Sequence, residues 1–330
     1  MVRFGVIGTN RITEQFIAAA RECEGVTLTA VYSRTEQQAH DFAAKFGIPH
    51  QYTDLESLAQ SDQVDAVYIA SPNSFHASQA ILMMEHGKHI LCEKPLASNG
   101  KEVRVMIESA RRNNVLLMEA LKSTLLPNFQ AIREHLPEIG QVRRYAASYC
   151  QYSSRYDAYK QGTILNAFNP FYSNGSLMDL GVYCIYPMVV LFGQPLGVQA
   201  NGLLLDSGVD GQGSLILKYS DMDAVITHSK ISPSYLPTEI QGENGTMIID
   251  KINSPEKVEI HYRNGSIHDV TNPQPYSSMY YEVQEFIDVL SRGERESTIN
   301  SHLHSMQSMD IMDEARRQIG LVFPADQSLI

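Results

Sequence analysis

Short apolar runs alternate with amphipathic stretches over the first 120 residues of the chain. The apolar runs predict strands at residues 2–8, 26–33, 64–70, 88–92 and 115–118, and the amphipathic stretches predict helices near 11–23, 36–46, 54–60, 74–86 and 99–113. Strands that alternate with helices form a parallel, doubly wound sheet, and such a sheet binds its ligands at the carboxyl ends of the strands. The first part of the chain therefore predicts an α/β domain with a ligand site at that edge.

The pattern changes after about residue 123, where strands begin to follow one another directly. Helices are predicted near 128–136, 176–191, 278–291 and 300–318, and strands at 141–151, 196–205, 212–219, 223–230, 236–241, 246–250, 257–262 and 266–270. The turns Asn244-Gly245 and Asn264-Gly265 are strong hairpin signals. This part predicts an α+β domain with a mainly antiparallel open sheet, and we divide the chain into domains 1–122 and 123–330.

Composition and charge narrow the class of protein. The 330 residues are 43% hydrophobic and 19% charged, which is enough to fill two cores. A net charge of −11 disfavours a nucleic-acid-binding protein. The amino terminus lacks a signal-peptide pattern and no stretch reads as long and apolar enough to span a bilayer, so we expect a soluble cytoplasmic protein. The cysteines and histidines show no metal-binding spacing, so no metal is expected.

The first predicted strand runs through Gly8 into a helix, as in the dinucleotide-binding motif G-x-G-x-x-G of Rossmann domains. Only Gly8 matches the motif, because Asn10 and Thr13 occupy the other two glycine positions. Asn tolerates left-handed backbone geometry, so the turn can survive. An ordinary strand–helix turn is the alternative reading, and the alternating pattern that follows favours the nucleotide site. The predicted cofactor contacts here are Gly8, Thr9, Asn10, Arg11 and Ile12.

The second predicted strand ends at Ser33 and Arg34. Sites for NAD usually carry an acidic residue at this position, which binds the ribose 2′-hydroxyl. A hydroxyl and a guanidinium suit a 2′-phosphate instead. A solvated arginine at the start of a helix is the competing interpretation. The sequence predicts NADP as cofactor and leaves NAD possible.

Two further segments carry candidate chemistry. Glu93 and Lys94 end an apolar strand directly before Pro95, which restricts the backbone of Lys94 and gives this lysine a fixed direction. Asp179 and Tyr183 are four residues apart in a predicted helix and would share one face. Tyrosine in an apolar helix is more often a packed residue, so this second pair is weak evidence by itself.

Taken together, five segments resemble the glucose–fructose oxidoreductase/inositol dehydrogenase (Gfo/Idh/MocA) family. They are GVIGTNRI at 5–12, IASPNSFH at 69–76, EKP at 93–95, MEA at 118–120 and GSLMDLGVY at 175–183. The chain is most similar to the tyrosine branch, which includes dimeric dihydrodiol dehydrogenase and NADP-dependent D-xylose dehydrogenase. The resemblance implies that Lys94 lies beside the nicotinamide, that Tyr183 donates or accepts a proton, and that Asp179 orients the site. It also implies that Ser71, Asn73, His76 and Glu93 contact the cofactor.

The resemblance implies an NAD(P)-dependent oxidoreductase that transfers a hydride between nicotinamide and a secondary alcohol or carbonyl of a sugar, polyol or diol. A phenol has a pKa of about 10, and a nearby ammonium lowers it by roughly 1–3 units, so the pairing of Lys94 with Tyr183 suits proton transfer. Lys122, Arg155, Tyr156 and Tyr172 are candidates for the substrate pocket, without assigned roles. A non-catalytic dinucleotide-binding sensor is the alternative. An open sheet predicts a homodimer, with a tetramer possible.

Overall fold

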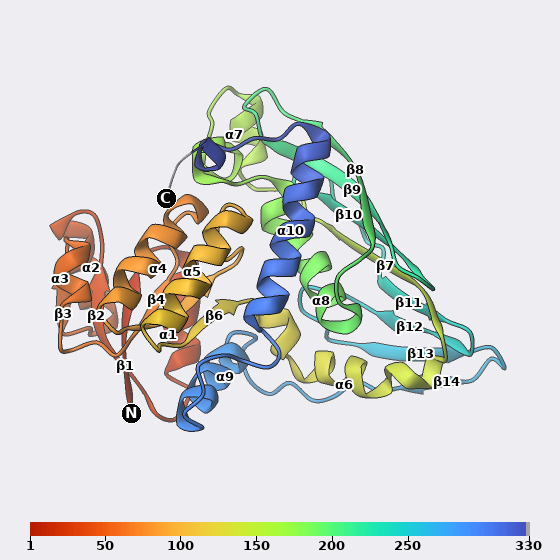
Figure 1. The fold of residues 1–330 in the computed structure, drawn as a ribbon, viewed down its shortest axis with the longest axis horizontal. Coiled ribbons are helices and arrows are strands. Elements are labelled where there is room, and N and C mark those ends of the chain that lie inside the picture. The colour runs from red at the N-terminus through yellow and green to blue at the C-terminus, as the bar shows by residue number, and fades with distance from the viewer. Residues whose placement is uncertain (328–330) are drawn as a thin grey trace. The chain divides into compact units, whose positions relative to one another are not determined.

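The computed structural model describes residues 1–327, which group into two compact units. The first unit consists of Met1–Leu121 and Tyr276–Ser305, and the second consists of Lys122–Pro275 with the residues from Met306 onward. The chain therefore returns to its first unit after forming most of the second (Figure 1). The sequence pattern places all of 123–330 in one domain, because periodicity shows which elements form but not which core they join.

The first unit is built on a six-stranded parallel sheet with the order β3-β2-β1-β4-β5-β6. Its strands are β1 (Val2–Ile7), β2 (Val26–Tyr32), β3 (His50–Tyr52), β4 (Ala66–Ile69), β5 (His89–Glu93) and β6 (Leu117–Ala120). The prediction of a doubly wound parallel sheet is confirmed. Strand β3 was not predicted, because three residues are too few to show a period and no hairpin turn marks the position of β3, as Asn264-Gly265 marks the equally short β14.

Helices flank this sheet and supply its core. They are α1 (Arg11–Ala20), α2 (Glu36–Phe46), α3 (Leu55–Ala59), the 3₁₀ turn η1 (Asn73–Phe75), α4 (His76–Glu85), α5 (Gly100–Arg112) and α9 (Tyr280–Ser291). Phe16 of α1 stacks on Tyr68 of β4 with ring centroids 3.8 Å apart. The ring centroid of Phe286 in α9 lies 5.4 Å from that of Phe4 in β1. These fully buried rings explain why the returning segment joins the first unit.

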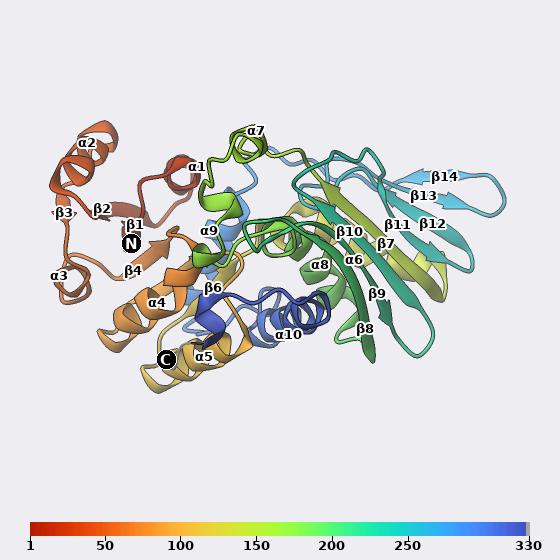
Figure 2. The same cartoon turned by 90° about the horizontal axis from the view of Figure 1, so that it is seen from above.

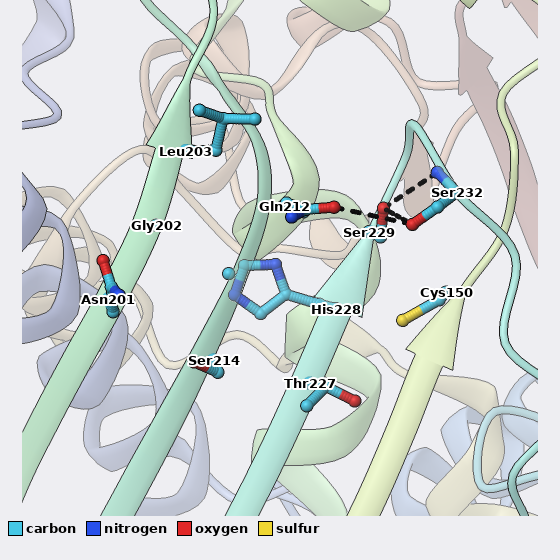
Figure 3. Close-up of a pocket in the computed structure, with 11 residues that line it drawn as sticks. Cys150, Asn201, Gly202, Leu203, Gln212, Ser214, Thr227, His228, Ser229 and Ser232 are labelled. Atoms are coloured by element: carbon cyan, nitrogen blue, oxygen red, sulfur yellow. Dashed lines mark hydrogen bonds between the residues drawn. The ribbon is translucent and has the colours of Figure 1, made fainter.

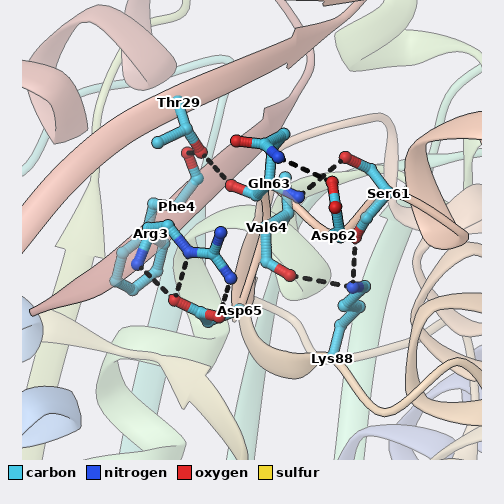
Figure 4. Close-up of polar contacts among 9 residues, drawn as sticks. All are labelled: Arg3, Phe4, Thr29, Ser61, Asp62, Gln63, Val64, Asp65 and Lys88. Atoms are coloured by element: carbon cyan, nitrogen blue, oxygen red, sulfur yellow. Dashed lines mark hydrogen bonds and ion pairs between the residues drawn. The ribbon is translucent and has the colours of Figure 1, made fainter.

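A polar network fastens the amino-terminal edge of this sheet (Figure 4). Arg3 at the start of β1 donates to both carboxylate oxygens of Asp65, just before β4, at 3.0 and 2.7 Å. Lys88, just before β5, donates to the carbonyl oxygens of Ser61 and Val64 at 2.6 and 2.8 Å. These contacts fix the strands at the edge opposite their carboxyl ends, which leaves the carboxyl edge for other roles.

The second unit contains an eight-stranded sheet with the order β14-β13-β12-β11-β7-β10-β9-β8. Its strands are β7 (Val142–Cys150), β8 (Gly197–Leu204), β9 (Asp210–Lys218), β10 (Asp223–Ser229), β11 (Thr238–Gly242), β12 (Gly245–Ile249), β13 (Val258–Tyr262) and β14 (Ile267–Asp269). Among the described strands of this sheet, only β10 and β7 pair in parallel, and the other neighbours are antiparallel. The predicted, mainly antiparallel sheet is confirmed.

Helices cover one face of this second sheet (Figure 2). They are α6 (Pro127–His135), α8 (Val182–Phe192) and α10 (His302–Ile319). The shorter elements of this part of the chain are α7 (Tyr156–Lys160), the π-helical turn η6 (Leu177–Gly181) and the 3₁₀ turns η2 (Lys122–Leu125), η3 (Leu136–Ile139), η4 (Asn166–Phe168), η5 (Pro170–Tyr172) and η7 (Pro324–Gln327). Leu215, Leu217, Ala224 and Ile226 face the helices and are buried, whereas alternate residues such as Ile216 face outward. One face of the sheet is therefore core and the other is open.

The segment Pro170–Phe192 is long and apolar enough to cross a membrane by length and composition, with a mean hydropathy of 1.6. The expectation that no stretch reaches this threshold was therefore wrong. However, 72% of the most apolar part of this segment is buried inside the protein, as is typical of a core helix. Its apolar composition thus matches its position against the second sheet.

Candidate functional site

The carboxyl edge of the first sheet gathers most of the predicted cofactor contacts. Strands β1 and β4 are neighbours in the sheet although β2 follows β1 in sequence, so the order reverses between them. Ligands of doubly wound sheets bind at such a switch point. The segments that follow β2, β1, β4 and β5 carry Ser33, Gly8, Ser71 and Lys94 respectively. Because these strands are parallel neighbours, the structure brings the four segments to one edge.

The turn from β1 into α1 depends on Gly8 and Asn10. Gly8 has a φ of +107°, and a Cβ at this position would lie 2.9 Å from the carbonyl oxygen of Ala70, so only glycine fits. Asn10 is extended, with φ −94° and ψ 176°, and not left-handed as the motif comparison suggested. Its Oδ1 accepts from the N–H groups of Ile12 and Thr13, both at 3.1 Å, and its Nδ2 donates to Ala70 at 2.7 Å. Asn10 therefore occupies the position of the second motif glycine and acts as the N-cap of α1.

The end of β2 presents one buried and one exposed polar side chain. Ser33 is buried, and its hydroxyl donates to Oε1 of Gln38 at 3.1 Å. Arg34 is exposed in the turn before α2, whose N-cap is Thr35. The guanidinium of Arg34 is therefore accessible for an anion next to this strand end, whereas the Ser33 hydroxyl already has an acceptor.

His76 connects the segments that follow β4 and β5. Its imidazole is fully buried, and its ring nitrogens lie 3.0 Å from the carbonyl oxygen of Pro95 and 2.9 Å from that of Ser71. Burial lowers the pKa of His76, and a neutral imidazole can donate only one of these hydrogen bonds. The hydroxyl of Ser71 donates to Gln79 at 2.7 Å. His76 thus braces the segment around Pro95 from within the first unit.

The Glu93-Lys94-Pro95 segment is held by two buried carboxylates. The Lys94–Pro95 peptide bond is cis. Glu93 accepts from the hydroxyl of Tyr68 at 2.5 Å and from the backbone N–H of Lys94 at 3.2 Å. On the other side, Glu119 of β6 accepts from the backbone N–H of Leu96 at 2.9 Å. The backbone on both sides of the proline is therefore fixed by side chains of neighbouring strands.

In the second unit, Asp179 and Tyr183 lie where the chain enters α8. The predicted α-helix begins instead with the π-helical turn η6, which contains Asp179, and Tyr183 follows in the first turn of α8. The wider π turn changes the i, i+4 relation on which the prediction of a shared face relied, and such turns are frequent at functional sites. The ring of Tyr183 packs edge-on against Tyr149 of β7, with centroids 5.7 Å apart.

Sequence reasoning missed the partner of Asp179. The Nζ atom of Lys230 lies 2.6 Å from Oδ2 of Asp179. The Lys230 side chain is 4% exposed and that of Asp179 is 37% exposed. The ammonium also lies 5.7 Å from the centre of the Phe168 ring. Because 51 positions separate the lysine from the aspartate, no local pattern could have identified this ion pair.

A buried polar cluster supports the same π turn. The Oγ atom of Ser176 lies 2.8 Å from Nδ1 of His228, and the backbone N–H of Leu177 donates to Asp210 at 2.7 Å. Burial raises the pKa of Asp210 to about 6 and lowers that of His228 to about 3. A Cβ on Gly175 would lie 2.1 Å from Oδ1 of Asp210, so glycine is required there. These contacts fix the backbone on which Asp179 stands.

A hollow of about 480 Å³ opens near the ends of strands β7–β10 (Figure 3). Polar side chains line much of it, including that of Gln212. Ser229 and Ser232 also line it, and their hydroxyl oxygens lie 2.9 Å apart. Gly213 pairs with His228 across the strands, and the missing side chain lets the imidazole reach the hollow. None of the predicted catalytic residues among those described lines this hollow.

The predicted catalytic residues divide between the two units. Lys94 belongs to the first unit, and Asp179 and Tyr183 belong to the second. Within each unit, buried neighbours fix the backbone that carries them. Their joint action on a substrate remains a prediction at this stage.

Comparison with known proteins places this architecture in a family. Residues 2–121 match the model of the oxidoreductase family with an NAD-binding Rossmann fold, GFO_IDH_MocA, and residues 129–248 match the GFO/IDH/MocA C-terminal domain. Relatives include scyllo-inositol 2-dehydrogenase (NADP(+)) IolU of Bacillus subtilis (strain 168), which is 56% identical over 328 residues covering 99% of this chain and 100% of that protein. Trans-1,2-dihydrobenzene-1,2-diol dehydrogenase of Danio rerio is 33% identical, and the match covers 98% of this chain and 99% of that protein.

Solved structures show the same fold at lower identity. The aldose-aldose oxidoreductase of Caulobacter crescentus superposes with a TM-score of 0.86 at 20% identity, covering 96% of this chain and 97% of that one. Both domain models and the full-length relatives agree with the two-unit structure described above. The chain therefore belongs to the Gfo/Idh/MocA family of oxidoreductases.

Proposed function

We propose that this protein is an NADP-dependent dehydrogenase that interconverts a ring secondary alcohol and the corresponding ketone of a cyclitol or related polyol. The observation that carries this proposal is the 56% identity over the full chain to scyllo-inositol 2-dehydrogenase (NADP(+)). Dihydrodiol dehydrogenases, also relatives over nearly the full length, act on vicinal diols by their names. Adjacent hydroxyls on a six-membered ring are the feature common to both kinds of substrate.

The residues at the carboxyl edge of the first sheet fit a dinucleotide. A close backbone approach at Gly8, where a Cβ would meet Ala70, and the start of α1 at Arg11 provide a place for a pyrophosphate. Thr9 and Ile12 complete this turn, and Ser71 and Asn73 follow β4 beside it. The exposed guanidinium of Arg34 would bind the 2′-phosphate that distinguishes NADP from NAD. When bound, the nicotinamide supplies the hydride acceptor or donor.

Three side chains would transfer the substrate's proton and stabilise the negative charge on its oxygen. Tyr183 would take the hydroxyl proton during oxidation and return it during reduction. The ammonium of Lys94 would favour the phenolate and stabilise negative charge on the substrate oxygen. Asp179 would orient the site, and its ion pair with Lys230 at 2.6 Å fixes its own direction. Glu93 would act through Lys94 by accepting from its backbone N–H, and His76 would position the same segment through the carbonyl oxygen of Pro95.

A double-mutant cycle tests whether Lys94 and Tyr183 act together. We expect Lys94→Met and Tyr183→Phe each to lower kcat with scyllo-inositol and NADP by about 10²–10⁴-fold. The double variant should lose little beyond the worse single variant, because residues that act as a unit are not additive. Tyr149→Phe, which changes the neighbouring ring, is the matched control and should retain most activity.

Substrate and cofactor classes are tested by following absorbance of the reduced nicotinamide with inositols, aldoses and vicinal diols. Cyclitols should give the highest kcat/KM.

Near-normal turnover in both the Lys94→Met and the Tyr183→Phe variant, or losses that multiply in the double variant, would contradict the proposed pair. Tight NADP binding without turnover on any of these substrates would favour the dinucleotide-binding sensor.

We also propose that the open face of the second sheet mediates a homodimer. Ile216 is 50% exposed on that face, and Leu203 is exposed to the same extent on the neighbouring strand. Sedimentation velocity should give a mass of twice 36.9 kDa, and Ile216→Asp should shift it towards the monomer. The four cysteines are free, which agrees with a reducing, cytoplasmic location.

A further inference from the structure

Two histidines and one glutamate meet in the second unit beside the edge hairpin β13–β14. His135 is the last residue of α6, Glu138 lies in the following turn η3, and His268 lies in β14. The Nδ1 atom of His135 is 2.6 Å from Oε1 of Glu138, and Nδ1 of His268 is 3.2 Å from Oε2 of the same carboxylate. The ligand atoms all lie within 4.8 Å of one another. Three groups that commonly bind transition metals therefore point at one small volume.

These distances suit a tetrahedral ion with short bonds. Zinc lies about 2.0–2.2 Å from histidine nitrogen and carboxylate oxygen, so two ligand atoms in a tetrahedral site are roughly 3.3–3.5 Å apart. The nitrogen–oxygen distance of 3.2 Å between His268 and Glu138 is close to this range. The distance of 2.6 Å between His135 and Glu138 is shorter than the range by about 0.8 Å. The two imidazoles meet edge-on at 88°, with ring centroids 5.5 Å apart, so they do not stack against each other. Side-chain rotations that move the His135 and Glu138 ligand atoms apart by roughly 1 Å would complete the geometry.

The surroundings of the carboxylate resemble those of a metal ligand. The hydroxyl of Tyr262, in the neighbouring strand β13, donates to Oε2 of Glu138 and holds it in place. The side chains of His135, Glu138 and His268 are 32%, 36% and 48% exposed, so an ion can reach them from solvent. A fourth position would remain for water, as in sites with three protein ligands.

We propose that His135, Glu138 and His268 form a site for a divalent transition-metal ion, with Zn²⁺ as the best-fitting ion. A bound ion would stabilise this part of the fold, because it would join the end of α6 to an edge strand of only three residues, all of them exposed. Local sequence spacing identifies only two of the three ligands, since His135 and Glu138 are three residues apart but His268 is 130 residues beyond Glu138.

Isothermal titration of the EDTA-treated, dialysed full-length protein with ZnCl₂ tests the site. We expect one ion per chain with micromolar affinity, and a rise in Tm on addition of Zn²⁺. Titration with CoCl₂ should give the visible absorption of tetrahedral Co²⁺. The variants His135→Gln and His268→Gln should each weaken Zn²⁺ binding by at least tenfold and abolish the Tm shift.

The matched control is His261→Gln, in the adjacent strand β13 and one residue from Tyr262. It should leave the affinity for Zn²⁺ unchanged. Absence of binding to the parent protein, or equal affinities for the parent and both ligand variants, would overturn the proposal. An equal loss in the His261→Gln control would also overturn it. Because these readouts do not involve NADP or substrate, their outcome is independent of the proposed dehydrogenase activity.

Discussion

Glu119 should make the stability of the protein depend on pH. The residue is 3% exposed, and burial is the main cause that raises the pKa of its carboxyl from 4.5 to about 7. Hydrogen bonds from Ser305 and from the backbone of Leu96, together with the charge of Lys94, oppose this effect, and the charge of Glu93 adds to it. The folded protein therefore keeps a proton on Glu119 at pH values where the unfolded chain has lost it.

The sign and size of the effect follow from linkage. Between pH 4.5 and about 7 the folded state binds more protons at this position, so the free energy of unfolding decreases as the pH rises through that window. The difference between the two pKa values corresponds to about 3 kcal/mol, as an order of magnitude. Glu119→Gln removes the titrating group, while the amide oxygen can still accept from the N–H of Leu96.

Urea unfolding of the parent and the Glu119→Gln variant at pH 5 and pH 8 measures this difference. We expect the variant to gain about 3 kcal/mol relative to the parent on going from pH 5 to pH 8, because other titrating groups cancel in the comparison. Glu108→Gln, an exposed change on α5, is the control and should show no such gain. A difference between variant and parent that is the same at both pH values would refute the reasoning.

Three further predictions concern the two halves of the proposed site. Asp179→Asn should lower the free energy of unfolding by about 3 kcal/mol and Lys230→Met by less, because only the first leaves a charge that is 4% exposed without its carboxylate partner; equal losses in thermal unfolding would contradict this. Gly8→Ala should weaken NADP binding at least tenfold in fluorescence titrations, since its Cβ would lie 2.9 Å from Ala70, and unchanged affinity would exclude a close approach there. Arg34→Ala should raise the KM for NADP about tenfold and leave that for NAD unchanged, so equal effects on both would argue against a 2′-phosphate contact.

The periodicity of the chain predicts most of the fold, because each long element shows its own pattern. The parallel sheet of the first unit and the mainly antiparallel sheet of the second were both predicted in this way. The three-residue strand β3 and the five-residue helix α7 were not, since elements this short show no period of their own. The equally short β14 was predicted because the Asn264-Gly265 turn lies beside it. The assignment of α9 to the first unit depends on the packing of Phe286 against Phe4, which no local pattern reveals.

In the candidate site, too, local motifs are readable from the sequence, whereas contacts between residues far apart in the chain are not. The position of Gly8 follows from a strand–helix motif, but the role of Asn10 as a cap depends on its contact with Ala70, 60 residues away. The π turn at Asp179 could not be distinguished from an α-helix by hydrophobic spacing. Lys230 belongs to a strand end in another part of the chain. The sequence therefore suggests candidate reactive side chains, whose roles stay predictions, but it does not reveal the groups that hold them.

The return of Tyr280–Ser291 to the first unit has a consequence for synthesis on the ribosome. The polypeptide that ends at Leu121 contains all six strands of the first sheet but lacks the helix that covers Phe4. At usual elongation rates that helix emerges roughly ten to thirty seconds later. The first unit therefore cannot complete its packing, and keeps an apolar face uncovered, until nearly the whole polypeptide has been synthesised. Chaperones that bind such faces should associate with this nascent chain throughout that interval.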